Sequence, residues 1–238
     1  MIPVSKSLIF YQLFEIETST YTYVVADAIT KEAVLIDPVL ETIERDIKLI
    51  TELGVKLKYV LDTHVHADHI TAAGQLRERL QIKTGLGAAA GVDCADIPLK
   101  NGDILTLGPT RIEVLETPGH TDSCVCYVIE DMVFTGDTLL VRGNGRTDFQ
   151  QGSSEKLYDS IHKLFQLPDH YTVYPGHDYR GQTKSTIALE KQHNPRIGGG
   201  RSKEEFVEIM KNLKLSDPKK MMEAVPANMA CGRQVQSK

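Results

Sequence analysis

The sequence predicts an α/β fold in which short strands alternate with helices. Three observations carry this prediction. Segments rich in β-forming residues recur along the 238-residue chain, longer segments place apolar residues at helical spacing, and polar side chains with metal-binding chemistry follow the strand-like segments. At 41% hydrophobic residues the chain can bury a substantial core, and nothing in it forces a division. We therefore expect one domain over residues 1–238, with a short helical C-terminal extension over about 195–238.

The first third is predicted to contain three strands and a helix, followed by a further strand and helix. Ile43, Ile47 and Ile50 recur at helical spacing, which indicates a helix from Glu41 to about Leu53. A helix from Ile70 to about Leu80 shows a similar pattern. The strands are Leu8–Phe14, Tyr21–Val25, Ala33–Ile36 and a segment ending in Tyr59-Val60-Leu61.

The middle is rich in predicted strands, and the last part is helical. Ser202 with Glu205 three residues later forms a capping box, which predicts a helix start. Pro218 stands at a permitted first-turn position of the last helix. The strands are Ile104–Leu107, Arg111–Glu116, Ser123–Ile129, Met132–Thr135 and Tyr171–Tyr174. The helices start at Ser154 (ending before Pro168), Thr183 (to Gln192), Lys203 (to Leu213) and Asp217 (to about Glu223).

Five histidines and two aspartates form a set of candidate metal ligands. Imidazole and carboxylate groups suit zinc, iron, copper and manganese. Each contribution follows a strand-like segment, so we expect strands to end where ligands begin. Glycine precedes the last three ligands, which lets the backbone turn sharply beside the metal. The set is His64, His66, Asp68 and His69 in one block, then His120, Asp137 and His177.

The histidine block and the later ligands resemble the metallo-β-lactamase superfamily. This resemblance implies an αββα sandwich of two mixed β-sheets with outer helices, with metal between the sheet edges. In hydrolytic members, one zinc would be held by His64, His66 and His120 and a second by Asp68, His69 and His177, with Asp137 as the bridge. Alternatively, His64, His120 and Asp137 alone form the two-imidazole, one-carboxylate set of non-haem iron(II) oxygenases. Ligand counting leaves both arrangements open.

Three other stretches resemble the persulfide dioxygenases, also called the sulfur dioxygenase or ethylmalonic encephalopathy protein family. These stretches are Gly143–Gly152, Gly176–Tyr179 and Val225–Met229. The resemblance implies oxidation of glutathione persulfide by O2 and water to sulfite and glutathione. It implies one Fe(II) per chain held by His64, His120 and Asp137, no organic cofactor, and a possible homodimer. The other four groups, His66, Asp68, His69 and His177, would then orient the ligands or move protons.

Glutathione carries two carboxylates, so its site should offer a cationic fork and a phenol or amide donor. Arg146 and Tyr179 are the candidates, because each follows a metal-ligand loop closely. A structural salt bridge with Asp148 explains Arg146 equally well. Further positive charge near this region is also explained by solvated helix faces; it comes from Arg180, Lys184, Arg196 and Arg201.

Composition excludes several classes of partner. With 27 basic and 32 acidic residues, the net charge is −5, which argues against nucleic-acid binding. The chain lacks the roughly 20 uninterrupted apolar residues of a membrane span. We expect a cytoplasmic protein, or a mitochondrial one if the source is eukaryotic and the chain is processed. The four cysteines lack C-x-x-C spacing and are predicted to be free thiols, with Cys124 and Cys126 packed as small hydrophobic residues.

The leading alternative function is a dinuclear zinc glutathione thioester hydrolase similar to glyoxalase II, which shares the histidine block. Such enzymes usually carry a longer helical C-terminal domain than the residues after His177 could form. A non-catalytic metal-binding protein would need seven intact polar groups to serve stability alone, which we consider a weaker interpretation.

Overall fold

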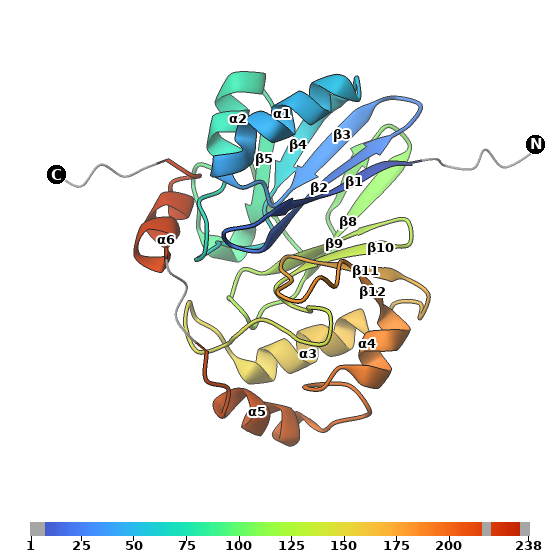
Figure 1. Cartoon of the computed structure of the whole chain (residues 1–238), viewed down its shortest axis with the longest axis vertical. Coiled ribbons are helices and arrows are strands. Elements are labelled where there is room, and N and C mark those ends of the chain that lie inside the picture. The colour runs from blue at the N-terminus through green and yellow to red at the C-terminus, as the bar shows by residue number, and fades with distance from the viewer. Residues whose placement is uncertain (1–7, 216–219, 234–238) are drawn as a thin grey trace, which may run out of the picture.

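Two six-stranded β-sheets face each other at the centre of the protein (Figure 1). The structure is a computed structural model and describes residues 8–215 and 220–233. The first sheet contains, in spatial order, β1 (Leu8–Glu15), β2 (Thr20–Asp27), β3 (Glu32–Ile36), β4 (Lys56–Leu61), β5 (Lys83–Gly87) and β6 (Ile97–Leu99). The second contains β12 (Ser185–Thr186), β11 (Thr172–Pro175), β10 (Met132–Gly136), β9 (Val125–Ile129), β8 (Thr110–Glu116) and β7 (Ile104–Leu107). Each sheet combines parallel and antiparallel pairs.

Helices cover the two outer faces. Above the first sheet lie α1 (Ile43–Glu52), entered through the 3₁₀ turn η1 (Leu40–Thr42), and α2 (Ala73–Leu80); a second turn, η2 (Ala88–Ala90), follows β5. Below the second sheet lie α3 (Ser154–Leu164), α4 (Ile187–His193) and α5 (Lys203–Lys211), and α6 (Met221–Met229) stands apart from them (Figure 1). The αββα sandwich of two mixed sheets is therefore confirmed.

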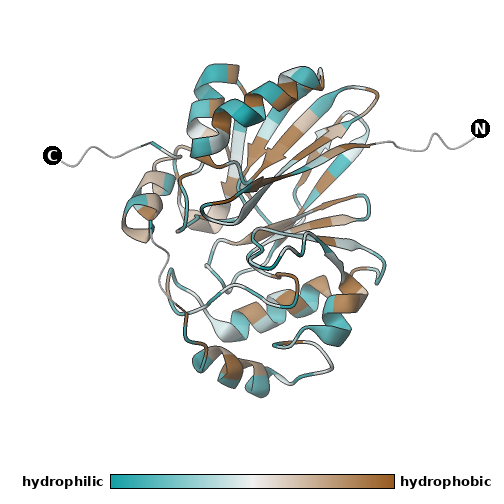
Figure 2. Ribbon diagram, in the orientation of Figure 1, coloured by the Kyte–Doolittle hydropathy of each residue, from teal (hydrophilic) through white to brown (hydrophobic). Residues whose placement is uncertain are grey.

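Three hydrophobic layers hold these elements together. Tyr23, Tyr127 and Phe134 are among the buried residues between the sheets. In β2, Tyr23 and Val25 point into this central layer, whereas Val24 points to the layer beneath α1 and α2, as the period of two requires. A third layer lies beneath α3, α4 and α5. Figure 2 shows the apolar residues concentrated on the strands and the helix faces that meet them.

Most predicted elements are confirmed, with differences at their ends. The capping box of Ser202 and Glu205 opens α5 as expected. The helix predicted from Ile70 starts only at Ala73, because Ile70 O instead accepts a hydrogen bond from Leu40 N at 2.8 Å. The helix predicted over 183–192 begins late because Ser185–Thr186 pair with β11. The last helix is described over Met221–Met229, past the predicted end near Glu223, and its predicted start at Asp217 and Pro218 lies outside the described residues.

The prediction of four free thiols is wrong for two of them. Cys94 and Cys231 form a disulfide whose Cα atoms are 6.1 Å apart. They are separated by 137 residues, so only the docking of α6 against the body brings them together, and local spacing could not reveal the pair. Cys124 and Cys126 are free and buried, as predicted, and burial raises the pKa of each thiol to about 12.

Within the part of the chain that the structure describes, the helices are too short or too polar to cross a bilayer.

Candidate active site

Strand ends bring the predicted ligands together at one edge of the sandwich. The block with His64 follows β4 in the first sheet, while His120 follows β8 and Asp137 follows β10 in the second. One ligand atom from each of these three residues lies within 4.8 Å of the others. Because β10 and β11 run parallel, with Gly136 opposite Pro175, His177 emerges beside Asp137. The expectation that the candidate ligands follow the ends of strands is confirmed.

Glycine is required next to these ligands. Gly136 has φ +48°, a conformation that side chains other than glycine rarely adopt. A Cβ atom there would also overlap Thr63 Oγ1. At Gly145, a Cβ would lie 2.8 Å from the ring of His120. These positions let the backbone approach the ligands closely.

The rings of His64 and His120 are oriented by hydrogen bonds on their Nδ1 atoms. His120 Nδ1 donates to Arg146 O at 2.7 Å, and His64 Nδ1 lies 3.0 Å from Thr63 Oγ1. The Thr63 hydroxyl in turn donates to Asp37 Oδ2 at 2.9 Å. Both imidazoles are thus held from one side, which leaves Nε2 free to bind an ion.

The electrostatic state of the three residues suits a divalent cation. Burial, together with the neighbouring His66, holds the pKa of His64 well below its usual range, so the ring is neutral. Burial alone would raise the pKa of Asp137, but the charge and hydrogen bond of His177 outweigh it and lower that pKa. The donors are therefore a neutral imidazole, a second imidazole and a carboxylate, which fit iron(II) as well as zinc.

A chain of hydrogen bonds leads away from Asp137. His177 Nδ1 lies 2.6 Å from Asp137 Oδ1, and His177 Nε2 lies 2.9 Å from Asp68 Oδ2. The same Asp68 oxygen is 2.9 Å from His69 Nδ1. Burial opposes the charge on His177, but the two carboxylates raise its pKa well above the usual value. Both nitrogens of His177 are thereby engaged by carboxylates.

Asp37 holds His66, and this contact was not predicted. Its Oδ1 lies 3.1 Å from His66 Nε2 and accepts the Thr63 backbone N–H at 2.7 Å. Burial alone would lower the pKa of His66, but Asp37 raises it to about 9. Asp37 follows β3 as the other site residues follow their strands, and this was the signal in the sequence that could have revealed it.

Two buried nitrogens of the block, His66 Nδ1 and His69 Nε2, have no hydrogen-bond partner among the described residues.

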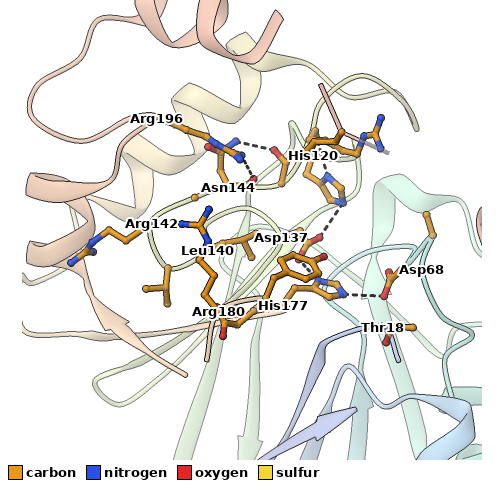
Figure 3. Close-up of a pocket in the computed structure, with 18 of the residues that line it drawn as sticks. Thr18, Asp68, His120, Asp137, Leu140, Arg142, Asn144, His177, Arg180 and Arg196 are labelled. Atoms are coloured by element: carbon orange, nitrogen blue, oxygen red, sulfur yellow. Dashed lines mark hydrogen bonds and ion pairs between the residues drawn. The ribbon is translucent and has the colours of Figure 1, made fainter. Parts of the chain in front are cut away.

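A cavity of about 580 Å³ opens beside the candidate ligands. His120 and Asp137 line it, together with His177 and Asp68. Figure 3 shows the side chains of Arg142, Arg180 and Arg196 on one side of the ligands and those of Thr18 and Asp68 on the other. Other lining groups include Glu17, Phe149, Asp178 and Lys220. The cationic side is chemically suited to an anionic ligand.

Both predicted substrate residues line this cavity. Arg146 donates to the two carboxylate oxygens of Asp148 at 2.6 and 2.7 Å, and its guanidinium lies 4.7 Å from the Phe149 ring centre. The salt bridge considered as the alternative for Arg146 therefore exists. Tyr179 is 72% exposed, and its ring lies nearly parallel to that of His177. Arg180 and Arg196 also face the cavity, whereas Lys184 and Arg201 do not line it.

A buried acid supports the side of the cavity that Arg142, Arg180 and Arg196 line, which we call the cationic wall. Glu190 of α4 is fully buried and pairs with the guanidinium of Arg142. It also accepts the Arg142 backbone N–H at 2.9 Å and the Asn194 side-chain N–H at 2.9 Å. Asn194 donates as well to Gly143 O at 3.0 Å. These bonds attach the loop after Asp137 to α4.

Comparisons with known proteins agree with this fold and indicate the family. Residues 16–103 and 96–177 match the family model described as the metallo-beta-lactamase superfamily. The mouse (Mus musculus) protein named persulfide dioxygenase ETHE1, mitochondrial, is 49% identical over 227 residues, covering 94% of this chain and 88% of the mouse protein. The crystal structure of ETHE1 from Myxococcus xanthus superposes with a TM-score of 0.92 at 55% identity and covers 94% of this chain and 100% of that one. The structure of TTHA1623 in a di-iron-bound form has a TM-score of 0.64 at 27% identity, covering 78% and 98%.

Proposed function

Because the chain belongs to the metallo-β-lactamase superfamily and, within it, to the persulfide dioxygenase family of oxidoreductases, we propose that it oxidises glutathione persulfide with O2 and water to sulfite and glutathione. The observation that carries this proposal is the convergence of His64, His120 and Asp137, of which His120 and Asp137 line the cavity. In the overall reaction the S–S bond breaks and the two persulfide sulfurs together lose four electrons, which O2 accepts. The outer sulfur becomes sulfite, the inner sulfur returns to the thiol of glutathione, and water supplies the third oxygen of sulfite.

One Fe(II) per chain would be held by His64, His120 and Asp137, and no organic cofactor is needed. Bound iron(II) supplies the redox chemistry that lets O2 react with the persulfide sulfur, which zinc cannot supply. The three side chains would hold the ion beside the cavity that His120 and Asp137 line, where both substrates could be oriented. The structure of TTHA1623 in a di-iron-bound form supports iron as the metal, since a protein of similar fold binds iron.

The remaining polar groups would serve these ligands. His177 can donate from Nδ1 to Asp137 and from Nε2 to Asp68. The bond to Asp137 would fix the orientation of the carboxylate that is to bind the metal. The hydrogen bonds from His177 to Asp68 and from Asp68 to His69 would offer protons a path from Asp137 toward the first sheet. Asp37 holds His66 at Nε2, which would fix the orientation of the His66 ring beside His64.

The cationic wall of the cavity would bind the carboxylates of the glutathione carrier. Tyr179 offers a phenol at the rim, and Arg146 offers a guanidinium that Asp148 and Phe149 hold in place. Arg180 and Arg196 line the same cavity. Burial and the nearby Arg180 lower the pKa of Arg196, so an anion would relieve unfavourable charge there.

One experiment separates this proposal from the dinuclear zinc thioester hydrolase. The protein, purified anaerobically, is analysed for metals and assayed with glutathione persulfide in an oxygen electrode. We expect about one iron per chain, O2 uptake and sulfite formation. Two zinc ions per chain, with hydrolysis of a glutathione thioester and no O2 uptake, would replace the proposal by the hydrolase.

Variants assign the roles within the same assay. His120→Ala and Asp137→Ala should lose iron, whereas His193→Ala, an exposed histidine of α4, should keep both iron and activity. Tyr179→Phe should keep iron but raise KM. An unchanged KM would remove Tyr179 from the substrate site.

Compartment and assembly stay predictions. We propose a cytoplasmic enzyme, or a mitochondrial one if the source is eukaryotic, as the name of the mouse relative says of that protein. The possible homodimer can be tested by size-exclusion chromatography with light scattering.

A further inference from the structure

The side chain of Asn228 in α6 binds the backbone of the loop that carries the histidine block. Its Oδ1 accepts the Thr71 N–H at 2.9 Å, and its Nδ2 donates to His66 O at 2.9 Å and His69 O at 2.8 Å. Asn228 is only 4% exposed. We call residues 63–71 the metal loop. One carboxamide therefore fixes three backbone groups of the metal loop from a helix more than 150 positions away in the sequence.

The metal loop has irregular backbone, so its polar groups need partners from elsewhere. Its start is held by Val125 N, which donates to Thr63 O at 2.8 Å, and its end by Leu40 N, which donates to Ile70 O at 2.8 Å. Asn228 holds the stretch between these two points. That stretch contains all four polar side chains of the block, His64, His66, Asp68 and His69.

Ring contacts transmit the position of this stretch to the candidate metal ligand. The imidazole of His66 lies 4.1 Å, centre to centre, from that of His64 and 4.2 Å from that of His69. All three rings are buried, so a shift of the His66 backbone would displace His64.

Helix α6 is fastened tightly enough to act as a support. Cys231 is joined to Cys94 by the disulfide, and its carbonyl accepts the Gly74 N–H at 3.0 Å. A Cβ at Gly232 would overlap Thr71 O, which shows how closely the chain after α6 approaches the metal loop. Figure 1 shows α6 at the edge of the sandwich and away from α5, and the bond from Gly74 N to Cys231 O joins the segment after α6 to α2.

We propose that Asn228 is a positioning residue for the metal centre: α6 sets the backbone of the metal loop through the Asn228 carboxamide and thereby the geometry offered to the metal. The inference rests on the metal site of the proposed function, but not on the reaction that occurs there. It also assigns a role to the Val225–Met229 stretch, which neither the ligands nor the cavity explain.

The test uses Asn228→Asp, which keeps the size of the side chain and the acceptor for Thr71 N–H. It replaces two N–H donors by an oxygen that faces two carbonyl oxygens. The control is Asn212→Asp after α5, an exposed asparagine whose Nδ2 bonds to Glu208 within its own helix region. Binding of Co²⁺ to the metal-free proteins is titrated, and the absorption spectrum of the bound ion reports its ligand geometry.

We expect Asn228→Asp to weaken Co²⁺ binding by about tenfold or more and to change the spectrum, since partners that orient ligands are typically worth 10–100-fold in affinity. Asn212→Asp should match the wild type in both. A folded Asn228→Asp protein with wild-type affinity and spectrum would overturn the proposal.

If Asn228→Asp does not fold, hydrogen exchange of the wild-type protein tests the positioning role of Asn228 instead. Coupling is reciprocal, so Co²⁺ should slow exchange of the Thr71 amide and of the α6 amides. Equal exchange with and without Co²⁺ would overturn the inference. A wild type that binds Co²⁺ but shows no O2 uptake with iron would instead overturn the dioxygenase proposal and leave the role of Asn228 intact.

Discussion

The buried carboxyl group of Asp46 in α1 should make the free energy of unfolding fall as the pH rises. Its side chain is fully buried, Oδ1 accepts from Arg45 Nε at 2.8 Å, and Oδ2 has no hydrogen-bond partner among the described residues. Burial disfavours the charged form more than Arg45 favours it, so the pKa of Asp46 rises from 3.8 to about 6.

The sign and size of the effect follow from linkage. The folded protein holds the Asp46 proton more tightly than the unfolded chain does, so between about pH 4 and pH 6 the unfolded chain binds fewer protons and stability falls as pH rises. Neutral Asp46 contributes its full stabilisation below about pH 4, the pKa of the unfolded chain. This stabilisation is lost as the pH rises through about 6, the pKa in the folded protein. At about 1.4 kcal/mol for each pKa unit, the shift corresponds to about 3 kcal/mol.

Asp46→Asn isolates this contribution. The amide oxygen can still accept from Arg45, and any unsatisfied N–H group adds an offset that does not depend on pH. Urea unfolding of the metal-free variant and wild type is measured from pH 4 to pH 8. We expect the difference in stability to move by about 3 kcal/mol in favour of the variant, mostly between pH 4 and pH 6. A difference that stays constant over this range would refute the reasoning.

Three further predictions follow from contacts elsewhere. Cys94→Ala should lower the free energy of unfolding by up to about 5 kcal/mol, because the disulfide closes a loop of more than 100 residues, and dithiothreitol should then have no further effect on the urea midpoint. Gly136→Ala should lose iron and at least about 1–2 kcal/mol of stability from the left-handed backbone and the overlap with Thr63, as metal analysis and urea unfolding would show. Glu190→Gln should raise KM for glutathione persulfide more than it lowers kcat and should lose about 3–5 kcal/mol of stability, since it leaves Arg142 without its buried partner; steady-state kinetics and unfolding together test this.

Local sequence patterns predicted the elements that carry the ligands. Strands rich in β-forming residues are found before His64, His120, Asp137 and His177, because their apolar side chains are buried by the facing sheet or by the helices. The strands that were not predicted have weak local signals. β5 contains Gly85 and Gly87, and β6 contains Pro98.

The glycine that hides β5 in the sequence is required by packing. A Cβ at Gly87 would overlap Ser123 O, in the loop that joins β8 to β9 of the second sheet. A residue with a stronger strand preference would therefore not fit at this position. Tertiary packing here overrides intrinsic propensity, which a local pattern cannot show.

The candidate site shows the same division. The residue types and their place after strands indicated a metal site, because imidazole and carboxylate groups have few other reasons to follow several buried strands together. The place of Asp37 after a strand was a signal for a site residue, but only the structure shows that it pairs with His66, because the two come from the ends of different strands. Arg146 could be assigned to a salt bridge or to the cavity, and the structure shows it in both environments.

The sequence by itself determined the fold class, the chemistry of the ligands and the family, because these depend on residue type and short-range spacing. Only the tertiary structure decided which groups meet. It paired Cys94 with Cys231, placed the arginines around one cavity, and brought Asn228 onto the metal loop. The disulfide and the Asn228 contact join residues more than 100 positions apart, and all of these arrangements follow from how the two sheets and the helices pack rather than from any local pattern.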